Sequence, residues 1–130
     1  MRMTIDDDTR RALERAWNCR LITVGRKSGE TRTVTIWFAL DGDEVVLTGG
    51  VNGPHWYRNL RASEDVELRI GRYRLRGRAR AIADEADVEA VRQCFLRRYL
   101  AARLSHPFGG YTNSVAVRVV VDRCEAASAR

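Results

Sequence analysis

The chain has 130 residues, of which 45% are hydrophobic and 31% are charged. This length and balance exclude a disordered chain and predict one soluble globular domain over residues 1–130, large enough for its own core. No apolar stretch is long enough to cross a bilayer, and the first residues lack the apolar core of a signal peptide. We therefore expect a cytoplasmic protein.

The chain is strongly basic, with a net charge of +6 and a pI near 9.9. Of its 23 basic residues, all but Lys27 are arginines. This charge favours anionic partners, which are nucleic acid, a membrane surface, or a phosphorylated or carboxylated small molecule. It does not choose among them.

The first predicted element is a helix that begins near residues 6–8, where three aspartates suit the positive end of the helix dipole. Leu13, Ala16 and Trp17 would form its buried face, and Asn18 would end it. A strand over residues 21–24 then leads into a glycine-containing turn.

Two strands are expected next. Residues 33–40 and 44–48 are rich in β-branched and aromatic side chains. Asp41 and Gly42 lie between them and form a typical two-residue hairpin signal. The glycine-rich residues 49–54 then end the second strand.

A short helix over residues 55–61, with Pro54 near its start, precedes a second hairpin. Residues 66–70 and 73–81 both alternate in polarity and are joined by a tight turn at residues 71–72. The predicted register pairs Ile70 with Tyr73, Leu68 with Leu75, Glu67 with Arg76, and Arg69 with Arg74.

The longest helical pattern covers residues 84–103, followed by a loop at 105–113 and a last strand at 115–121. Strands joined mainly by hairpins imply an antiparallel sheet, and six strands with few solvated faces suggest a curled one. The predicted fold is therefore α+β, with a six-stranded antiparallel barrel and helices packed outside it.

Two glycine loops are the candidate binding elements. Residues 25–32 place two glycines, a hydroxyl and three cations together, which suits either a phosphate cradle or a solvated hairpin turn. Residues 49–53 could bring backbone amides close to a flat ring. Together the two loops favour a cofactor cleft.

Other chemistry finds little support in the residues. The three cysteines, Cys19, Cys94 and Cys124, form no C-x-x-C unit, and each is expected to be a small buried hydrophobe. His55 and His106 have no metal-ligand spacing, so no metal site is expected. No G-x-S-x-G motif points to a serine hydrolase.

Five arginines alternate along one strand face, at positions 72, 74, 76, 78 and 80. Such a face is either solvated and partly neutralised by Glu64, Asp65 and Glu67, or it binds nucleic acid. No aromatic residue interleaves with these arginines, so the solvated face is the preferred interpretation.

Two segments in order resemble the signature of the deazaflavin-dependent nitroreductase family. They are L-I-T-V-G-R-K-S-G-E-T-R at residues 21–32 and P-H-W-Y-R-N-L-R-A at residues 54–62. The resemblance implies a split β-barrel related to the FMN-binding pyridoxamine phosphate oxidases. It also implies binding of coenzyme F420, the 8-hydroxy-5-deazaflavin that carries a phosphate and an oligoglutamate tail.

The resemblance also implies roles for particular residues. The phosphate and tail would be held by Arg26, Lys27, Ser28 and Arg32. The ring would be approached by Gly50, Val51, Asn52, Pro54 and Trp56. Tyr111 could act as a proton donor near the substrate, although from the residues alone it could equally be a core phenol with a satisfied hydroxyl.

The leading hypothesis is an oxidoreductase in which reduced deazaflavin passes hydride to a quinone, a nitro compound or an activated alkene. A relative that uses FMN, or a non-catalytic barrel that binds flavin, deazaflavin or haem, is the alternative. A basic nucleic-acid-binding module is a further one. Because barrels of this kind often bury apolar faces by pairing, a homodimer is a reasonable expectation.

Overall fold

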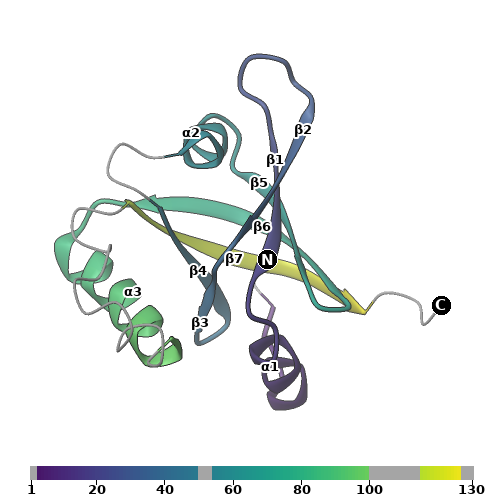
Figure 1. Cartoon of the computed structure of the whole chain (residues 1–130), viewed down its shortest axis with the longest axis vertical. Coiled ribbons are helices and arrows are strands. Elements are labelled where there is room, and N and C mark those ends of the chain that lie inside the picture. The colour runs from purple at the N-terminus through teal and green to yellow at the C-terminus, as the bar shows by residue number, and fades with distance from the viewer. Residues whose placement is uncertain (1–2, 50–53, 100–114, 127–130) are drawn as a thin grey trace.

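The computed structural model describes residues 3–49, 54–99 and 115–126. Its three helices and seven strands follow in the order α1 (Asp7–Glu14), β1 (Cys19–Val24), β2 (Thr31–Ile36), β3 (Ala39–Asp41), β4 (Glu44–Gly49), α2 (His55–Ala62), β5 (Asp65–Ile70), β6 (Tyr73–Ile82), α3 (Glu85–Arg98) and β7 (Val115–Ala126). The helices lie outside the strands, as expected from the sequence (Figure 1).

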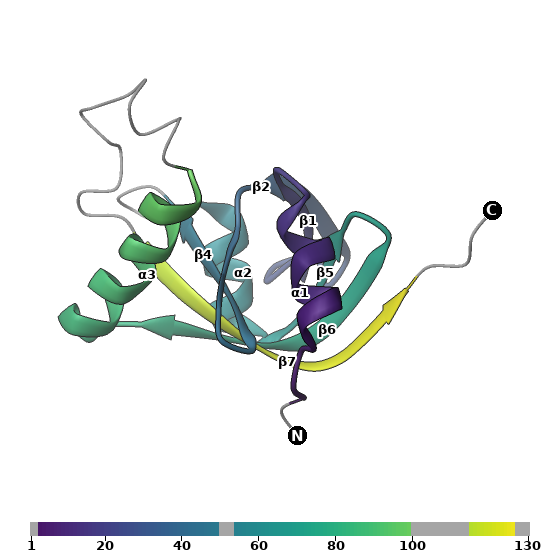
Figure 2. The ribbon, with the colours of Figure 1, turned by 90° about the horizontal axis from the view of Figure 1, so that it is seen from below.

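All seven strands form one antiparallel sheet with the order β2-β1-β5-β6-β7-β4-β3. The first and last strands of this order are joined by only two residues, Trp37 and Phe38. A link of this length spans at most about 11 Å between the flanking Cα atoms. The sheet must therefore curl until its two edges meet, and Figure 2 shows this strong curvature along β6 and β7.

The predicted strand over residues 33–40 is thus two strands, which raises the predicted count from six to seven. Trp37 is 41% exposed while Phe38 is fully buried, so neighbouring side chains take opposite environments at the corner. The hydroxyl of Tyr99 lies 2.7 Å from the Phe38 carbonyl oxygen and holds this corner from the end of α3. Propensity alone does not reveal the break, because both halves suit a strand.

The register of the second hairpin is confirmed. Its four predicted pairs all occur between β5 and β6, and Gly71 in the turn has φ +58°. In the β3–β4 hairpin, Asp41 pairs with Glu44. The two turn residues are therefore Gly42 and Asp43, rather than the predicted Asp41 and Gly42. Gly42 supplies the positive φ of this turn, at +63°.

The predicted ends of one helix and one strand need correction. Helix α1 ends at Glu14, and Trp17 is 66% exposed instead of facing the core. The Arg98 side chain donates a hydrogen bond to the Glu14 carbonyl oxygen over 3.3 Å, satisfying one group at this helix end. Strand β7 runs to Ala126, five residues beyond its predicted end, because it pairs with the whole of β6.

The core lies inside the curled sheet and is covered by α1 and α2. Leu13 from α1 and Leu60 from α2 join the buried side chains of β1, β5 and β6 there. A second buried cluster lies where α3 packs on β3, β4 and β7, with Val91 and Phe95 at its centre. The β6–β7 register shifts between Arg76 and Gly77, because β7 carries one extra residue there, Asp122. Such bulges increase the bend of a strand, and next to this one the Val120 carbonyl oxygen leaves no room for a Cβ on Gly77.

The arginine face has the partly neutralised arrangement expected of a solvated surface. Its five arginines are exposed, with Arg72 in the turn and the other four on β6. The carboxylate of Glu67 lies 3.6 Å from Arg74 and 3.5 Å from Arg76.

None of the helices in the described parts of the chain is long and apolar enough to span a membrane.

A buried arginine links the β3–β4 hairpin and α3 to β7. Arg118 is 8% exposed and lies 2.8 Å from Asp41, 3.2 Å from Glu44 and 2.7 Å from Asp87. Its hydrogen bonds lower the pKa of Asp87 below the ordinary value of 3.8, so this carboxylate stays ionised at neutral pH. One guanidinium thus pairs with carboxylates from three elements.

We expect Arg118→Met to lower the free energy of unfolding by about 3–5 kcal/mol, because it leaves these carboxylates together without their cation. Urea unfolding at pH 7 measures the change. Arg78→Met is the matched control, since Arg78 is exposed and lies 3.9 Å from Asp122. That variant should lose less than about 1 kcal/mol. Equal losses in the two variants would contradict the account of this cluster.

Candidate functional site

The turn between β1 and β2 is closed by its own backbone. The N–H of Gly25 donates to the Glu30 carbonyl oxygen over 2.7 Å, and the N–H of Gly29 donates to the Gly25 carbonyl oxygen over 2.9 Å. Gly29 has φ +76°, a conformation that side chains disfavour. A Cβ on Gly25 would lie 2.8 Å from Ser28 Oγ and 3.1 Å from the Glu30 carbonyl oxygen, so the Ser28 hydroxyl would have to move from its present position.

Ser28 organises the far side of the same turn. Its Oγ accepts a hydrogen bond from the Glu30 N–H over 3.1 Å and one from the Arg32 guanidinium over 3.4 Å. Arg32 also lies 3.9 Å from the Glu30 carboxylate, and its side chain is 60% exposed. The Arg32 guanidinium is therefore steered toward the turn while staying accessible to a ligand.

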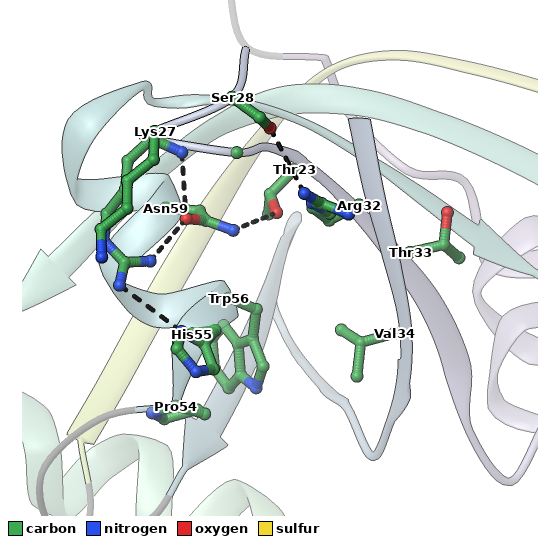
Figure 3. Close-up of a pocket in the computed structure, with 12 residues that line it drawn as sticks. Thr23, Lys27, Ser28, Arg32, Thr33, Val34, Pro54, His55, Trp56 and Asn59 are labelled. Atoms are coloured by element: carbon green, nitrogen blue, oxygen red, sulfur yellow. Dashed lines mark hydrogen bonds between the residues drawn. The ribbon is translucent and has the colours of Figure 1, made fainter. Parts of the chain in front are cut away.

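A cavity of about 590 Å³ opens between this turn and the start of α2 (Figure 3). Its volume lies within the usual range for small-molecule sites. The described residues that line it are Thr23, Gly25, Arg26, Lys27, Ser28, Arg32, Thr33, Val34, Pro54, His55, Trp56 and Asn59.

The cavity has two chemically different sides. Arg26, Lys27 and Arg32 bring three positive charges, and none of the twelve described lining residues carries a carboxylate. Val34, Pro54 and Trp56 supply apolar surface. Such an arrangement suits a ligand with a flat apolar part and an anionic tail.

Helix α2 forms one wall and connects directly to the cationic turn. Asn59 is 4% exposed, and its Oδ1 accepts hydrogen bonds from the Arg26 backbone N–H over 3.2 Å and from Arg26 Nη1 over 2.8 Å. Arg26 Nη2 lies 3.4 Å from His55 Nδ1. The amide nitrogen of Asn59 lies 3.4 Å from Thr23 Oγ1.

The structure brings six of the residues predicted for the cofactor into this one cavity. They are Arg26, Lys27, Ser28, Arg32, Pro54 and Trp56. Their role in binding stays a prediction. The other predicted residues, Gly50, Val51, Asn52 and Tyr111, lie outside the described parts of the chain.

Gly25 lines the cavity as part of the predicted turn of residues 25–32. Five further lining residues were not predicted from the sequence, and they are Thr23, Thr33, Val34, His55 and Asn59. A signal for Asn59 was available, because it lies on the same helix face as Trp56 and Leu60, at i+3 and i+4 from Trp56. An amide on an otherwise apolar face indicates a buried polar contact.

The thiols do not fit nucleophilic chemistry. Burial raises the pKa of the Cys19 thiol to about 12, despite the opposing charge of Arg98. Burial also raises the pKa of Cys94 and of Cys124. All three are thus protonated at neutral pH. Cys19 and Cys94 are buried as expected, whereas Cys124 is only half-buried. Among the described residues, no group of histidine, cysteine, aspartate and glutamate side chains could hold a metal ion.

Comparison with known proteins places the chain in a family. The profile of the F420H2-dependent quinone reductases matches residues 3–120. The chain belongs to this family. The match covers nearly the whole chain, including the turn of residues 25–30 and helix α2. This agrees with the family resemblance of the two sequence motifs.

A curated relative is the F420H2-dependent quinone reductase Rv1261c of Mycobacterium tuberculosis, which is 38% identical over 55 residues. The aligned part is 39% of this chain and 37% of that relative. A counterpart from Mycobacterium bovis, with the same family name, matches over the same extent. The chain thus spans little more than a third of the curated relatives it matches.

Solved structures show the same fold at low identity. An F420 reductase has a TM-score of 0.67 at 22% identity, over 93% of this chain and 98% of its own. A protein named as a candidate pyridoxamine 5′-phosphate oxidase from Listeria innocua has a TM-score of 0.71 at 18% identity, over 92% of this chain and 95% of its own. The heme storage protein HutZ of Vibrio cholerae has a TM-score of 0.72 at 12% identity, over 95% of each chain. The expected split β-barrel of the FMN-binding class is confirmed.

We expect Gly25→Ala to lower the free energy of unfolding by about 1–3 kcal/mol, because its new methyl group would collide with Ser28 Oγ. Urea unfolding measures this loss. Adding Ser28→Ala removes the closest colliding atom, so the double variant should be more stable than Gly25→Ala alone. Additive losses from the two substitutions would contradict the tight closure of the turn.

Proposed function

We propose that this protein is an oxidoreductase that uses reduced coenzyme F420 to reduce a quinone. The observation that carries the proposal is the two-sided cavity between the β1–β2 turn and α2, in a chain that belongs to the F420H2-dependent quinone reductase family. Deazaflavin has a flat ring and an anionic tail, and the cavity has a matching apolar side and cationic side.

Four residues of the turn would hold the anionic part of the coenzyme. Lys27 and Arg32 are exposed at the cavity, and Arg26 and Ser28 line it beside them. Charge-assisted hydrogen bonds from such groups to phosphate and carboxylate oxygens are about twice as strong as neutral ones. The turn would therefore supply affinity and fix the direction of the tail.

The apolar side would orient the ring and exclude water from it. Trp56 is 7% exposed and belongs to the core, so its indole presents a rigid surface to the cavity. Pro54, at the start of α2, lies beside it (Figure 3). The bound coenzyme supplies the hydride, which leaves positioning and shielding to the protein.

Reduction of a quinone by hydride also consumes a proton. Tyr111 as the donor of this proton stays a proposal that follows from the family resemblance. So do Gly50, Val51 and Asn52 as residues near the ring. A homodimer and a cytoplasmic location also stay predictions from the sequence.

Activity is tested by mixing the purified protein with reduced F420 and menadione, a soluble quinone, and following the return of the oxidised coenzyme's absorbance. We expect turnover that depends on the protein. A nitroaromatic and an activated alkene in parallel reactions identify the preferred acceptor class. Tight binding of F420 without turnover of any acceptor would instead favour a non-catalytic binder, and turnover with FMN alone would favour a flavin enzyme.

The cationic turn gives a binding prediction. Replacing Lys27 and Arg32 together by alanine should raise the F420 dissociation constant at least about tenfold, because each cation is expected to make a charge-assisted contact. Fluorescence titration of the coenzyme measures this. The melting temperature should hardly change, since both side chains are exposed.

The matched control replaces Arg20 and Arg123 by alanine. Both are exposed, and their removal costs the protein the same two charges away from the cavity. Affinity for F420 should stay within about twofold of wild type, because exposed charges beyond a Debye length are largely screened. An unchanged dissociation constant in the Lys27 and Arg32 variant would contradict the assignment of the turn.

A further inference from the structure

Asn59 is a buried polar residue on the apolar face of α2. It is 4% exposed and lies between Trp56 and Leu60, which are both in the core. A buried amide is costly unless its oxygen and nitrogen find partners. All the partners that the structure gives it are in the region of the cationic turn, which suggests a role beyond packing.

The donors around Asn59 determine how its amide is oriented. The backbone N–H and the guanidinium of Arg26 can only donate, so the amide oxygen must face them. The amide nitrogen then faces Thr23 Oγ1, which can accept. One side chain thus ties α2 to the end of β1 and to both the backbone and the charged group of Arg26.

The groups that hold Arg26 carry no negative charge. Asn59 Oδ1 is a neutral acceptor, and His55 Nδ1 must lack a proton in order to accept from Arg26 Nη2. A carboxylate in either position would pair with the guanidinium and offset its charge. An amide instead fixes the guanidinium and leaves its full charge for an anion in the cavity.

The other two cations of the turn are held less firmly. Lys27 is exposed, and the Arg32 side chain is 60% exposed. Arg26 is less exposed than either, and two of its guanidinium nitrogens contact side chains of α2, Nη1 the Asn59 oxygen and Nη2 the His55 ring. A cation ordered before binding loses less side-chain entropy when the ligand arrives. Arg26 is therefore the pre-organised member of the three.

We propose that Asn59 is a positioning residue, which acts through Arg26 to prepare the cavity for the anionic part of the cofactor. The inference rests on the proposed function for the identity of that cofactor. It adds a buried residue of α2 to the binding machinery and explains why the amide, rather than a carboxylate, suits this position.

A double-mutant cycle on F420 affinity tests the proposal. Asn59→Ala should raise the dissociation constant about tenfold in the wild-type background and less than about twofold in an Arg26→Met background, because its effect passes through Arg26. Arg61→Met, which removes a charge from the exposed side of the same helix, is the control and should leave affinity within about twofold of wild type.

Asn59→Asp separates positioning from simple packing, and it keeps the test valid where Asn59→Ala fails to fold. Aspartate keeps an oxygen facing Arg26, so the melting temperature of this variant should stay close to that of the wild-type protein. The new ion pair offsets the guanidinium charge, so the F420 dissociation constant should still rise about tenfold. Wild-type affinity in Asn59→Asp, or an equal effect of Asn59→Ala with and without Arg26, would overturn the proposal.

The same titrations run with F420 and with FMN distinguish the two proposals. Binding of F420 with no coupling between Asn59 and Arg26 leaves the proposed function in place and overturns the role of Asn59. Binding of FMN alone overturns the proposed function, and the cycle measured on FMN then decides the role of Asn59. If the wild-type protein binds neither, both proposals are wrong.

Discussion

The curvature of the sheet is the constraint on which the rest of the structure depends. Strands β2 and β3 lie at opposite ends of the strand order, yet only Trp37 and Phe38 separate them in the chain. The sheet can satisfy this only by closing on itself, and closure creates the enclosed core. The buried Phe38 and the Tyr99 hydroxyl stabilise the corner where the edges meet.

The candidate site is a consequence of the same geometry. Strand β1 leads to the glycine turn, and α2 packs against β1 and β6, so the turn and the helix face each other across one cavity. The buried Asn59 side chain of α2 links the helix to the turn, because its Oδ1 accepts two hydrogen bonds from Arg26. The described residues that line this cavity include three cations and no carboxylate.

Much of the fold followed from local patterns, because hairpins and amphipathic helices depend on neighbouring residues. The β5–β6 register was predicted pair by pair, since alternation and a tight turn leave little freedom. Errors arose where distant contacts override local preference. Trp17 suits a buried helix face, but the helix ends before it, and residues 33–40 suit one strand but bend at the corner.

The sequence by itself determined the cationic turn, the helix that begins after Pro54 and the family to which both motifs belong. It could not say that the turn and the helix form opposite walls of one cavity, because their proximity depends on how the sheet curls. It also could not assign Asn59, Thr23 or His55 to the site. Their roles are decided by hydrogen bonds between residues about thirty or more positions apart, which only the tertiary structure brings within reach.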